Sequence, residues 1–285
     1  MNGLMNYVIW DTDGNVFVIP FIHHPIRWYG LAWGVGFLLS QQIMYFIYKK
    51  EGRTTKEIDK LTVYMLIGTI AGARFGHVLF YDAGYYFHNP LHIFFIWEGG
   101  LASHGAAVGI LTAVYLFARK TRVDYLWILD RLSIVAAFTG CLIRLGNLMN
   151  SEMIGLPTRV PWAFVFTQVD DIPRHPAQLY EAICCFFLSL LLFRMWSNHR
   201  GQRKNGNMFA WFLIILFSFR FIDEFFKINQ ESFEDTLLLN MGQILSIPFI
   251  VTGLIILIIN ARKGNHAVLS EKQFKSHSTD SSHTP

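Results

Sequence analysis

The chain has 285 residues, of which 53% are hydrophobic and only 15% are charged. Soluble domains carry roughly 25% charged residues, so this composition excludes an ordinary soluble globular protein and indicates an integral membrane protein. The net charge of +4 does not require a nucleic-acid partner, because basic cytoplasmic loops that face anionic lipid account for it.

Residues 1–26 precede the first long apolar run and include Asp11, Asp13 and Gly14 beside a short apolar stretch. They lack the basic start and the cleavage pattern of a secretory signal peptide. We therefore expect that this segment is not removed and that it lies on the outer surface of the membrane.

Seven apolar runs follow, each close to the roughly 20 residues that a helix needs to cross a hydrocarbon core. The expected spans cover residues 28–48, 61–81, 93–118, 132–148, 178–196, 207–226 and 243–261. Within them, 182–193 and 208–219 are uninterrupted for only twelve residues, a length that also fits a core helix of a soluble protein. The predicted fold is an all-α polytopic bundle of about seven transmembrane helices.

The distribution of Lys and Arg supports the two weak spans. The loops at 49–60, 119–131, 194–204 and 262–275 are rich in both residues, whereas the alternate loops hold only Arg159, Arg174 and Lys227. Because basic loops stay in the cytoplasm, the amino terminus is expected outside and the carboxyl terminus in the cytoplasm. Seven spans fit this alternation and six do not.

The last segment, 264–285, contains Lys272, Lys275 and a run of Ser, His and Thr. It has too little apolar surface to fold. We expect an integral membrane domain over residues 1–263, followed by a disordered cytoplasmic tail.

Cys141, Cys184 and Cys185 all lie in apolar segments, and adjacent cysteines do not form an ordinary disulfide framework. We interpret them as inert small hydrophobic residues. The sequence has no Cys and His spacing typical of a metal site and no phosphate loop, so no metal or cofactor is expected.

Small residues recur four positions apart, which lets membrane helices approach closely. The pairs are Gly30 with Gly34, Gly68 with Gly72, Gly72 with Gly76, and Gly105 with Gly109. Gly99, Gly100 and Gly105 surround His104, and they could instead break or thin the third span and open room for a ligand.

Four arginines lie in or at the edge of the expected spans: Arg27, Arg74, Arg144 and Arg220. In the predicted topology all four lie toward the outer side. A guanidinium stays charged at any accessible pH and needs an anion, a carboxylate or water at membrane depth. Extension of the side chain to the interface accounts for Arg27, but it does not easily account for all four.

Arg144 is the most informative of them, because a strongly apolar segment ends there. Gly146, Asn147, Asn150 and Glu152 follow before Gly155. This change in chemistry at the end of a span predicts an anion site.

Other polar groups in the spans have two interpretations each. His104 is either a packing histidine near the middle of the third span or a functional group. Arg220 and Glu224, four residues apart, share a helix face and could be only an internal ion pair. The run from Arg174 to Glu181 enters the fifth span with Pro176 in its first turn, which is an ordinary helix start, although its density of hydrogen-bond donors is not.

Taken in order, these blocks resemble the bacterial prolipoprotein diacylglyceryl transferase family over nearly the whole chain. The similar blocks are 28–31 (WYGL), 98–105 (EGGLASHG), 144–155 (RLGNLMNSEMIG), 174–181 (RHPAQLYE), 219–226 (FRFIDEFF) and 241–248 (MGQILSIP). Ala106, Ile143 and Leu148 stand where the family usually has Gly, Gly and Phe. These departures affect backbone detail and remove no polar role.

The resemblance implies transfer of the diacylglyceryl group of phosphatidylglycerol to the thiol of the lipobox cysteine in a prolipoprotein signal peptide, with release of glycerol phosphate. It also implies a multi-pass protein of the bacterial cytoplasmic (inner) membrane with its active site toward the outer half. No cofactor is implied.

The residues suit this reaction. Arginines match the oxygens of a phosphodiester leaving group, which makes Arg144 and Arg220 the candidates. A thiol is only a few per cent thiolate at neutral pH, so a base is needed, and His104 is the candidate, with the field of Arg144 as an alternative.

The resemblance gives the remaining residues supporting roles. Tyr29 adds a hydroxyl, Asn147, Asn150 and Glu152 would orient the head group and hold Arg144, and Glu224 would position Arg220. Further site residues are Gly146, Gly155, Arg74, Glu98, Arg174 and Tyr180.

Two other classes of function use the same residues. An anionic-lipid transporter would grip its substrate with these arginines without chemistry, and a membrane phospholipid hydrolase would use His104 to activate water. Both alternatives stay open at the level of the sequence.

Overall fold

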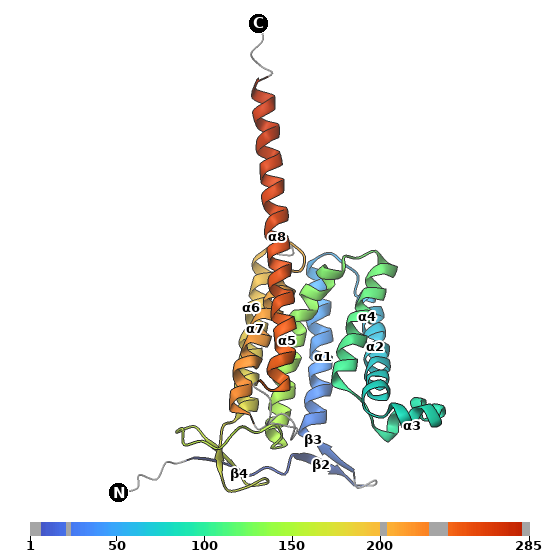
Figure 1. Cartoon of the computed structure of the whole chain (residues 1–285), viewed down its shortest axis with the longest axis vertical. Coiled ribbons are helices and arrows are strands. Elements are labelled where there is room, and N and C mark those ends of the chain that lie inside the picture. Colours follow the sequence, from blue (N-terminus) through green and yellow to red (C-terminus); the bar gives the residue numbers. More distant parts are fainter. Residues whose placement is uncertain (1–6, 21–23, 200–203, 228–238, 281–285) are drawn as a thin grey trace. The chain divides into compact units, whose positions relative to one another are not determined.

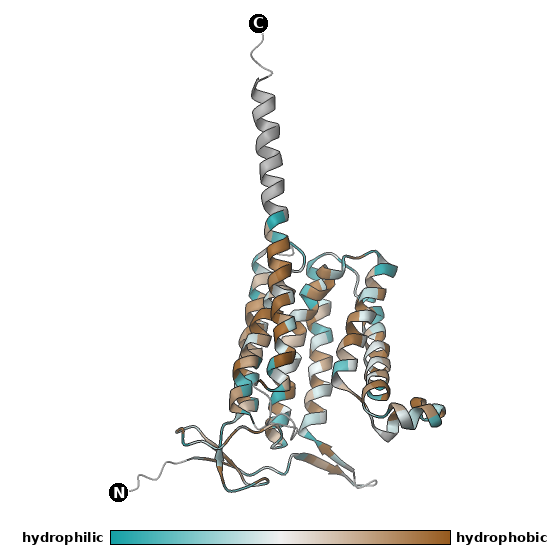
Figure 2. Cartoon of the chain, in the orientation of Figure 1, coloured by the Kyte–Doolittle hydropathy of each residue, from teal (hydrophilic) through white to brown (hydrophobic). Residues whose placement is uncertain are grey.

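The structure is a computed structural model that describes residues 7–20, 24–199, 204–227 and 239–280. It is mostly helical, and within the described chain five helices are long and apolar enough to cross a membrane (Figures 1 and 2). They are α1 (Trp28–Lys50), α2 (Lys56–Phe80), α5 (Tyr125–Met149), α6 (Ala177–His199) and α8 (Met241–Asp280). The chain is thus a helical, multi-pass membrane protein.

Two of the expected spans correspond to shorter helices. They are α4 (Ser103–Thr121, 19 residues) and α7 (Asn207–Asp223, 17 residues). Helix α8 ends at Asp280, beyond residue 264, where the tail is expected to begin. Extension of a helix beyond an apolar span has a simple physical cause, since each residue added to an existing helix gains a backbone hydrogen bond without a new nucleus. The division between membrane domain and tail stays a prediction.

The chain divides into two compact units, one formed by residues 41–132 and the other by residues 1–40 with 133–285. Helices α1 and α5 each run from one unit into the other. We describe each unit by itself.

In the unit of residues 41–132, glycines bring α2 and α4 into backbone contact. A Cβ atom on Gly72 would lie 2.4 Å from the carbonyl oxygen of Gly105, and one on Gly68 would lie 2.6 Å from that of Gly109. The predicted close approach is therefore confirmed for these helices. It is wrong for Gly30 and Gly34 of α1, which have no described atom within 4 Å of the position of a Cβ.

The third span begins later than the sequence predicts. Residues 93–102 are not helical membrane span, because η1 (Pro90–Phe94) and η2 (Ile96–Glu98) lead into a turn at Gly99 and Gly100. These two glycines have φ of 90° and 72°, a region that glycine enters without steric cost. His104, expected near the middle of a span, is the second residue of α4.

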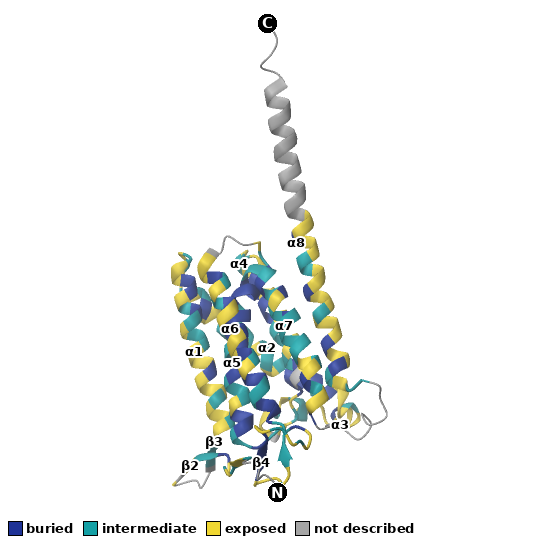
Figure 3. Cartoon of the chain, turned by 90° about the vertical axis from the view of Figure 1, so that its left-hand side faces the viewer, coloured by how far each residue is buried: buried dark blue, intermediate teal, exposed yellow. Residues whose placement is uncertain are grey.

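The larger unit contains the amino-terminal part of α1, most of α5, and α6, α7 and α8, with η3 (Glu224–Phe226) extending α7. Helix α7 packs against both α6 and α8. Much of the surface of α8 is exposed (Figure 3), and large apolar side chains such as Leu254, Ile255 and Ile258 contribute to it. Exposed apolar residues on a long helix are what contact with lipid requires.

Short strands depart from the all-α prediction. Strand β1 (Val8–Trp10) runs parallel to β4 (Phe164–Phe166), which pairs in turn with β5 (Pro173–Arg174). Strands β2 (Asn15–Ile19) and β3 (His24–Arg27) form a separate antiparallel pair. Segments of two to five residues give too weak a periodicity to be recognised as strands beside seven apolar runs.

The amino-terminal strands hold the end of α5. The indole nitrogen of Trp10 donates to the carbonyl oxygen of Leu148 at 2.9 Å, and Leu148 packs with Phe164 and Phe166. Gly14, at φ 73°, lies so close to Asn150 that a Cβ would be 2.8 Å from the amide oxygen. The block after Arg144 therefore has a fixed backbone.

Candidate active site

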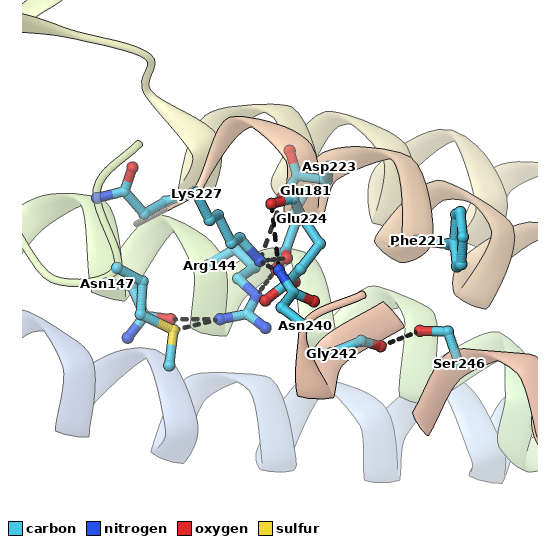
Figure 4. Close-up of polar contacts among 12 residues, drawn as sticks. Arg144, Asn147, Glu181, Phe221, Asp223, Glu224, Lys227, Asn240, Gly242 and Ser246 are labelled. Atoms are coloured by element: carbon cyan, nitrogen blue, oxygen red, sulfur yellow. Dashed lines mark hydrogen bonds and ion pairs between the residues drawn. The ribbon is translucent and has the colours of Figure 1, made fainter. Parts of the chain in front are cut away.

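An ion network joins three helices of the larger unit. It consists of Arg144 on α5, Glu181 on α6, Asp223 at the end of α7, Glu224 on η3 and Lys227. Nε of Arg144 pairs with one carboxylate oxygen of Glu181, and Nζ of Lys227 pairs with the other. Figure 4 shows these side chains converging. One carboxylate thus fixes two cations.

The ammonium group of Lys227 lies among the three carboxylates of the network. Its Nζ lies 3.2 Å from Oδ2 of Asp223 and 3.6 Å from Oε2 of Glu224, and its side chain is only 7% exposed. Asp223 is buried, and neither of its carboxylate oxygens has hydrogen-bond geometry with a partner in the described chain. The single ammonium group of Lys227 therefore compensates the negative charge of three carboxylates, and Arg144 also compensates the charge of Glu181.

The loop after α5 fixes the backbone of Lys227. The amide of Leu156 donates to the carbonyl of Phe226 at 2.7 Å, and that of Gly155 donates to the carbonyl of His175 at 2.9 Å. A Cβ on Gly155 would lie 2.7 Å from the carbonyl oxygen of Phe226 and 2.6 Å from that of His175. Gly155, predicted as a site residue, is therefore needed for the close approach of three chain segments.

Arg144 is held from its other side by the asparagine block. Its Nη1 donates to Oδ1 of Asn147 at 3.3 Å. The side-chain amides of Asn147 and Asn150 each donate to Glu152 at 3.0 Å. The prediction that these residues hold Arg144 is thus refined, since Glu152 acts through Asn147 and not by direct contact.

The same loop contains unusual backbone conformations. Ser151 and Met153 have φ of 53° and 55°, a left-handed region that is costly for side chains other than glycine. The amide of Gln178 fixes the loop by donating to the carbonyl of Glu152 at 2.5 Å. Strained residues of this kind cluster at functional sites, where the surrounding structure maintains them.

The guanidinium of Arg144 keeps donors available. Its side chain is 18% exposed, Nε is used by Glu181, and Nη1 is used by Asn147 and by a contact with the sulfur of Met153. In the described residues Nη2 has no hydrogen-bond partner. An oriented, partly exposed cation with a free edge is suited to bind an anion.

Arg220 and Glu224 do not form the ion pair that their spacing predicts, as far as the described chain shows. Helix α7 ends at Asp223 and η3 begins at Glu224. The carboxylate of Glu224 lies toward Lys227 and Gly242, where a Cβ would be 2.5 Å from its Cδ. The guanidinium of Arg220 is exposed and close enough to attract the carboxylate of Glu181.

Glu224 is also placed by the start of α8. The side-chain amide of Asn240 donates to the carbonyl of Glu224 at 3.5 Å, and that of Gln243 donates to the carbonyl of Phe221 at 3.3 Å. Figure 4 shows Gly242 of α8 beside the network. The amino end of a helix favours a neighbouring carboxylate.

Tyr29 and Gly146 are brought together by helix packing. A Cβ on Gly146 would lie 3.0 Å from Cα of Tyr29 and 3.1 Å from Cβ of Ala32. Gly146 therefore lets the start of α1 lie against α5, and Tyr29 packs against a position two residues along the chain from Arg144.

Arg174 and Tyr180 support the loops around the network. Arg174 pairs with Asp170 at 2.5 Å, and its hydrogen bonds lower the pKa of that carboxyl group. The hydroxyl of Tyr180 accepts from the indole nitrogen of Trp162 at 2.8 Å and lies 3.0 Å from Nδ1 of His175. Burial lowers the pKa of His175 below its ordinary value, which favours the neutral ring.

The smaller unit holds the other predicted site residues. His104 is exposed, and its ring lies 5.8 Å from the rings of both Phe80 and Tyr81. In the described chain no hydrogen bond engages its ring nitrogens. Glu98 ends η2, and its side chain lies outside the described residues.

The hydrogen bonds of Arg74 indicate a structural role and not an anion-binding site. Its Nε, Nη1 and Nη2 atoms donate to backbone carbonyls of the loop that precedes α4, with acceptors on His92, Ile93, Phe95, Gly99 and Gly100. Arginine has five N–H donors, and five acceptors surround this one. Arg74 therefore fixes the segment that leads to His104.

Sequence reasoning missed Glu181, Asp223 and Lys227. Lys227 counted only as a basic residue of an outer loop, and Glu181 only as the end of a polar block. The spacing of Asp223 and Lys227, four residues apart, was the available signal. In the described residues no cluster of three or more His, Cys, Asp or Glu could hold a metal ion.

Comparison with known proteins identifies the family of the chain. The family model described as prolipoprotein diacylglyceryl transferase matches residues 16–259. A protein of Tolumonas auensis named phosphatidylglycerol–prolipoprotein diacylglyceryl transferase is 45% identical over 257 residues, which cover 90% of this chain and 98% of the relative. Relatives with the same name are 40% identical in Bacteroides fragilis, over 92% of this chain and 99% of theirs, and 42% identical in Chloroherpeton thalassium, over 88% and 94%. The chain therefore belongs to the prolipoprotein diacylglyceryl transferase family.

Proposed function

We propose that this protein transfers the diacylglyceryl group of phosphatidylglycerol to the thiol of a lipobox cysteine in prolipoproteins, and that it does so in the bacterial cytoplasmic membrane. The observation that carries the proposal is the guanidinium of Arg144, which Glu181 and Asn147 orient while it stays partly exposed. The family membership supports the same reaction.

The reaction replaces one bond to the glyceryl carbon that bears the phosphate. The thiolate sulfur attacks this carbon and forms a thioether, the carbon–oxygen bond breaks, and glycerol phosphate leaves with the electron pair. The leaving phosphate gains negative charge. Arg144 and the exposed Arg220 stabilise that charge, because charge-assisted hydrogen bonds to developing charge lower the barrier.

His104 accepts the thiol proton in this proposal. Its ring is exposed on α4 and its nitrogens are not engaged within the described chain, as a general base requires. Tyr29 contributes a hydroxyl near the head group, and Asn147, Asn150 and Glu152 order the phosphate side. Arg74 supports the loop before His104, and Arg174 and Tyr180 support the loops around the ion network. Glu98 is kept in the proposal as a further supporting residue.

The proposed topology has seven spans, with the amino terminus outside, the carboxyl terminus cytoplasmic and the active site toward the outer half. Helices α4 and α7, with 19 and 17 residues, are the two additional spans. At about 1.5 Å per residue they approach the thickness of roughly 30 Å of the hydrocarbon core. The alternation of basic loops supports the orientation.

The test uses membranes that contain the protein, phosphatidylglycerol and a peptide with a lipobox cysteine. Lipidated peptide and glycerol phosphate should form together. Arg144→Lys should lower the rate by roughly 10²–10³, the effect of losing an oriented donor to developing charge, since a single ammonium cannot pair with Glu181, hold Asn147 and bind phosphate at once.

Arg159→Lys is the matched control, because Arg159 is exposed in an outer loop, and its rate should equal that of the parent. Release of glycerol phosphate without lipidated peptide would identify a hydrolase instead. Unchanged activity in a folded Arg144→Lys variant would remove Arg144 from the site.

A further inference from the structure

An apolar groove runs between α6 and α7 of the larger unit. It has a volume of about 500 Å³. The α6 wall includes Tyr180, Cys184 and Leu191, and the α7 wall includes Ile215, Phe219 and Asp223. The α6 residues repeat at three- and four-residue spacing, so they form one stripe along the helix. The groove therefore follows these two packed helices.

The groove has a polar end and an apolar end. Asp223, at one end, is the carboxylate that lies 3.2 Å from Lys227 of the ion network. Helices α6 and α7 are consecutive in the chain and pack against each other in antiparallel directions. Leu191 and Ile215 therefore lie at the opposite end of the groove from Asp223. Polarity thus follows the order found in a phospholipid, with charged groups first and hydrocarbon beyond them.

The length of the groove also fits one lipid chain. From Tyr180 to Leu191 the helix rises about 16 Å, at 1.5 Å per residue. Half of the hydrocarbon core is about 15 Å, which is the depth that an acyl chain of one leaflet reaches.

We propose that this groove holds one acyl chain of the phospholipid substrate while the ion network binds its head group. The inference rests on the proposed function and extends it to the choice of lipid. Since lipid surrounds the helices, burial in the groove gives little hydrophobic gain, and the fit of the chain to the walls decides selectivity. The deep end, at Leu191 and Ile215, sets the length of chain that is accepted.

The test compares phosphatidylglycerols with short and long chains. The ratio of kcat/KM for dipalmitoyl over dilauroyl phosphatidylglycerol is measured for the parent, Leu191→Trp and Leu190→Trp. Leu190 and Leu191 are adjacent leucines of α6 that are 50% and 44% exposed, and of the two only Leu191 lines the groove. Leu190→Trp is therefore a matched control.

Leu191→Trp should lower this ratio at least roughly threefold, a modest effect beside the discrimination of 10-fold or more per methylene in closed pockets. Leu190→Trp should leave the ratio at the parent value. Ile215→Phe, which narrows the same end from α7, should change the ratio in the same direction and serves if Leu191→Trp does not fold.

Equal ratios in all variants, or equal changes in Leu190→Trp and Leu191→Trp, would overturn the proposal. A change in KM for the peptide without a change in the lipid ratio would assign the groove to the signal peptide and also overturn it. If the parent lipidates no peptide with either lipid, the proposed function itself fails, and the inference fails with it.

Discussion

Glu181 connects the two cations of the site, so its carboxylate couples the position of Arg144 to that of Lys227. Buried charges are stable only when partners compensate them, and removal of one partner leaves the others uncompensated. The residues around the network therefore depend on one another. This dependence is strongest for Lys227, because its ammonium group faces three carboxylates.

Replacement of Lys227 should test this dependence. Lys227→Met removes the cation within 3.2 Å of Asp223 and 3.6 Å of Glu224, and we expect a loss of roughly 3–5 kcal/mol of stability. Adding Asp223→Asn should recover part of the loss, because one uncompensated carboxylate is removed. Thermal unfolding in detergent measures both. Additive effects of the two changes would contradict the network, and Lys227→Arg, which keeps the charge, is the control.

His104→Gln should lower turnover by roughly 10²–10⁴ if His104 takes the thiol proton. The variant should recover part of its rate in alkaline buffer, because a free thiol with a pKa of about 8.5 then ionises without help. The rate of lipidation measured from neutral to alkaline pH decides this. A folded variant with the parent's neutral rate would transfer activation of the thiol to the field of Arg144.

The block from Arg144 to Gly155 could be predicted from sequence, because a short segment brings its own residues together whatever the fold. Arg144, Asn147 and Glu152 are connected as expected, with Asn147 as the link. The pairing of Lys227 with Glu181 could not be predicted, since it depends on contact between segments far apart in the chain. The orientation of Glu224 depends in the same way on Gly242 of α8.

At the scale of elements, the packing of α2 against α4 depends on glycine. Gly72→Ala should destabilise the protein by roughly 1–3 kcal/mol, the usual cost of overpacking, because the new Cβ would lie 2.4 Å from the backbone oxygen of Gly105. Gly34→Ala of α1 meets no described atom within 4 Å and should leave stability unchanged. Thermal unfolding of both variants checks this pair, and equal stability would mean that α2 and α4 can separate without cost.

The segment that contains His175 should respond to acid. Burial lowers the pKa of His175 from its ordinary value of 6.5, so the neutral ring is favoured in the folded state. The stability that it contributes is present above pH 6.5 and is lost as the pH falls from this value toward the lower folded pKa. Thermal unfolding between neutral and mildly acidic pH should therefore show a decline, and His175→Phe should flatten it. An identical decline in the variant would assign the effect to another group.

The long helices were predictable because runs of apolar residues specify them directly. The start of α4 was not, because the apolar run continues through 93–102 while Gly99 and Gly100 turn the backbone. The hydrogen bonds of Arg74 to this loop explain why it stays out of the helix. Composition alone contains no information about such long-range contacts.

At the scale of the whole molecule, the orientation in the membrane can be measured with reporter fusions. An alkaline phosphatase fused after about residue 87 should be active, and one fused after about residue 125 should be inactive, because basic loops stay in the cytoplasm. Expression levels of both fusions provide the control. The opposite pattern would contradict both the seven spans and the outer location of the site.

The pairing of Val8 with Phe164 and of Trp10 with Phe166 sets an order of events during synthesis. The first strand leaves the ribosome long before its partner exists, and contacts of such sequence separation form late. The amino-terminal segment must remain unpaired while the helices between these strands insert. Since Trp10 holds Leu148 at the end of α5, the end of this helix gains its full support only after more than half of the chain has been translated, because a chain that ends before Phe164 has no partner for the first strand.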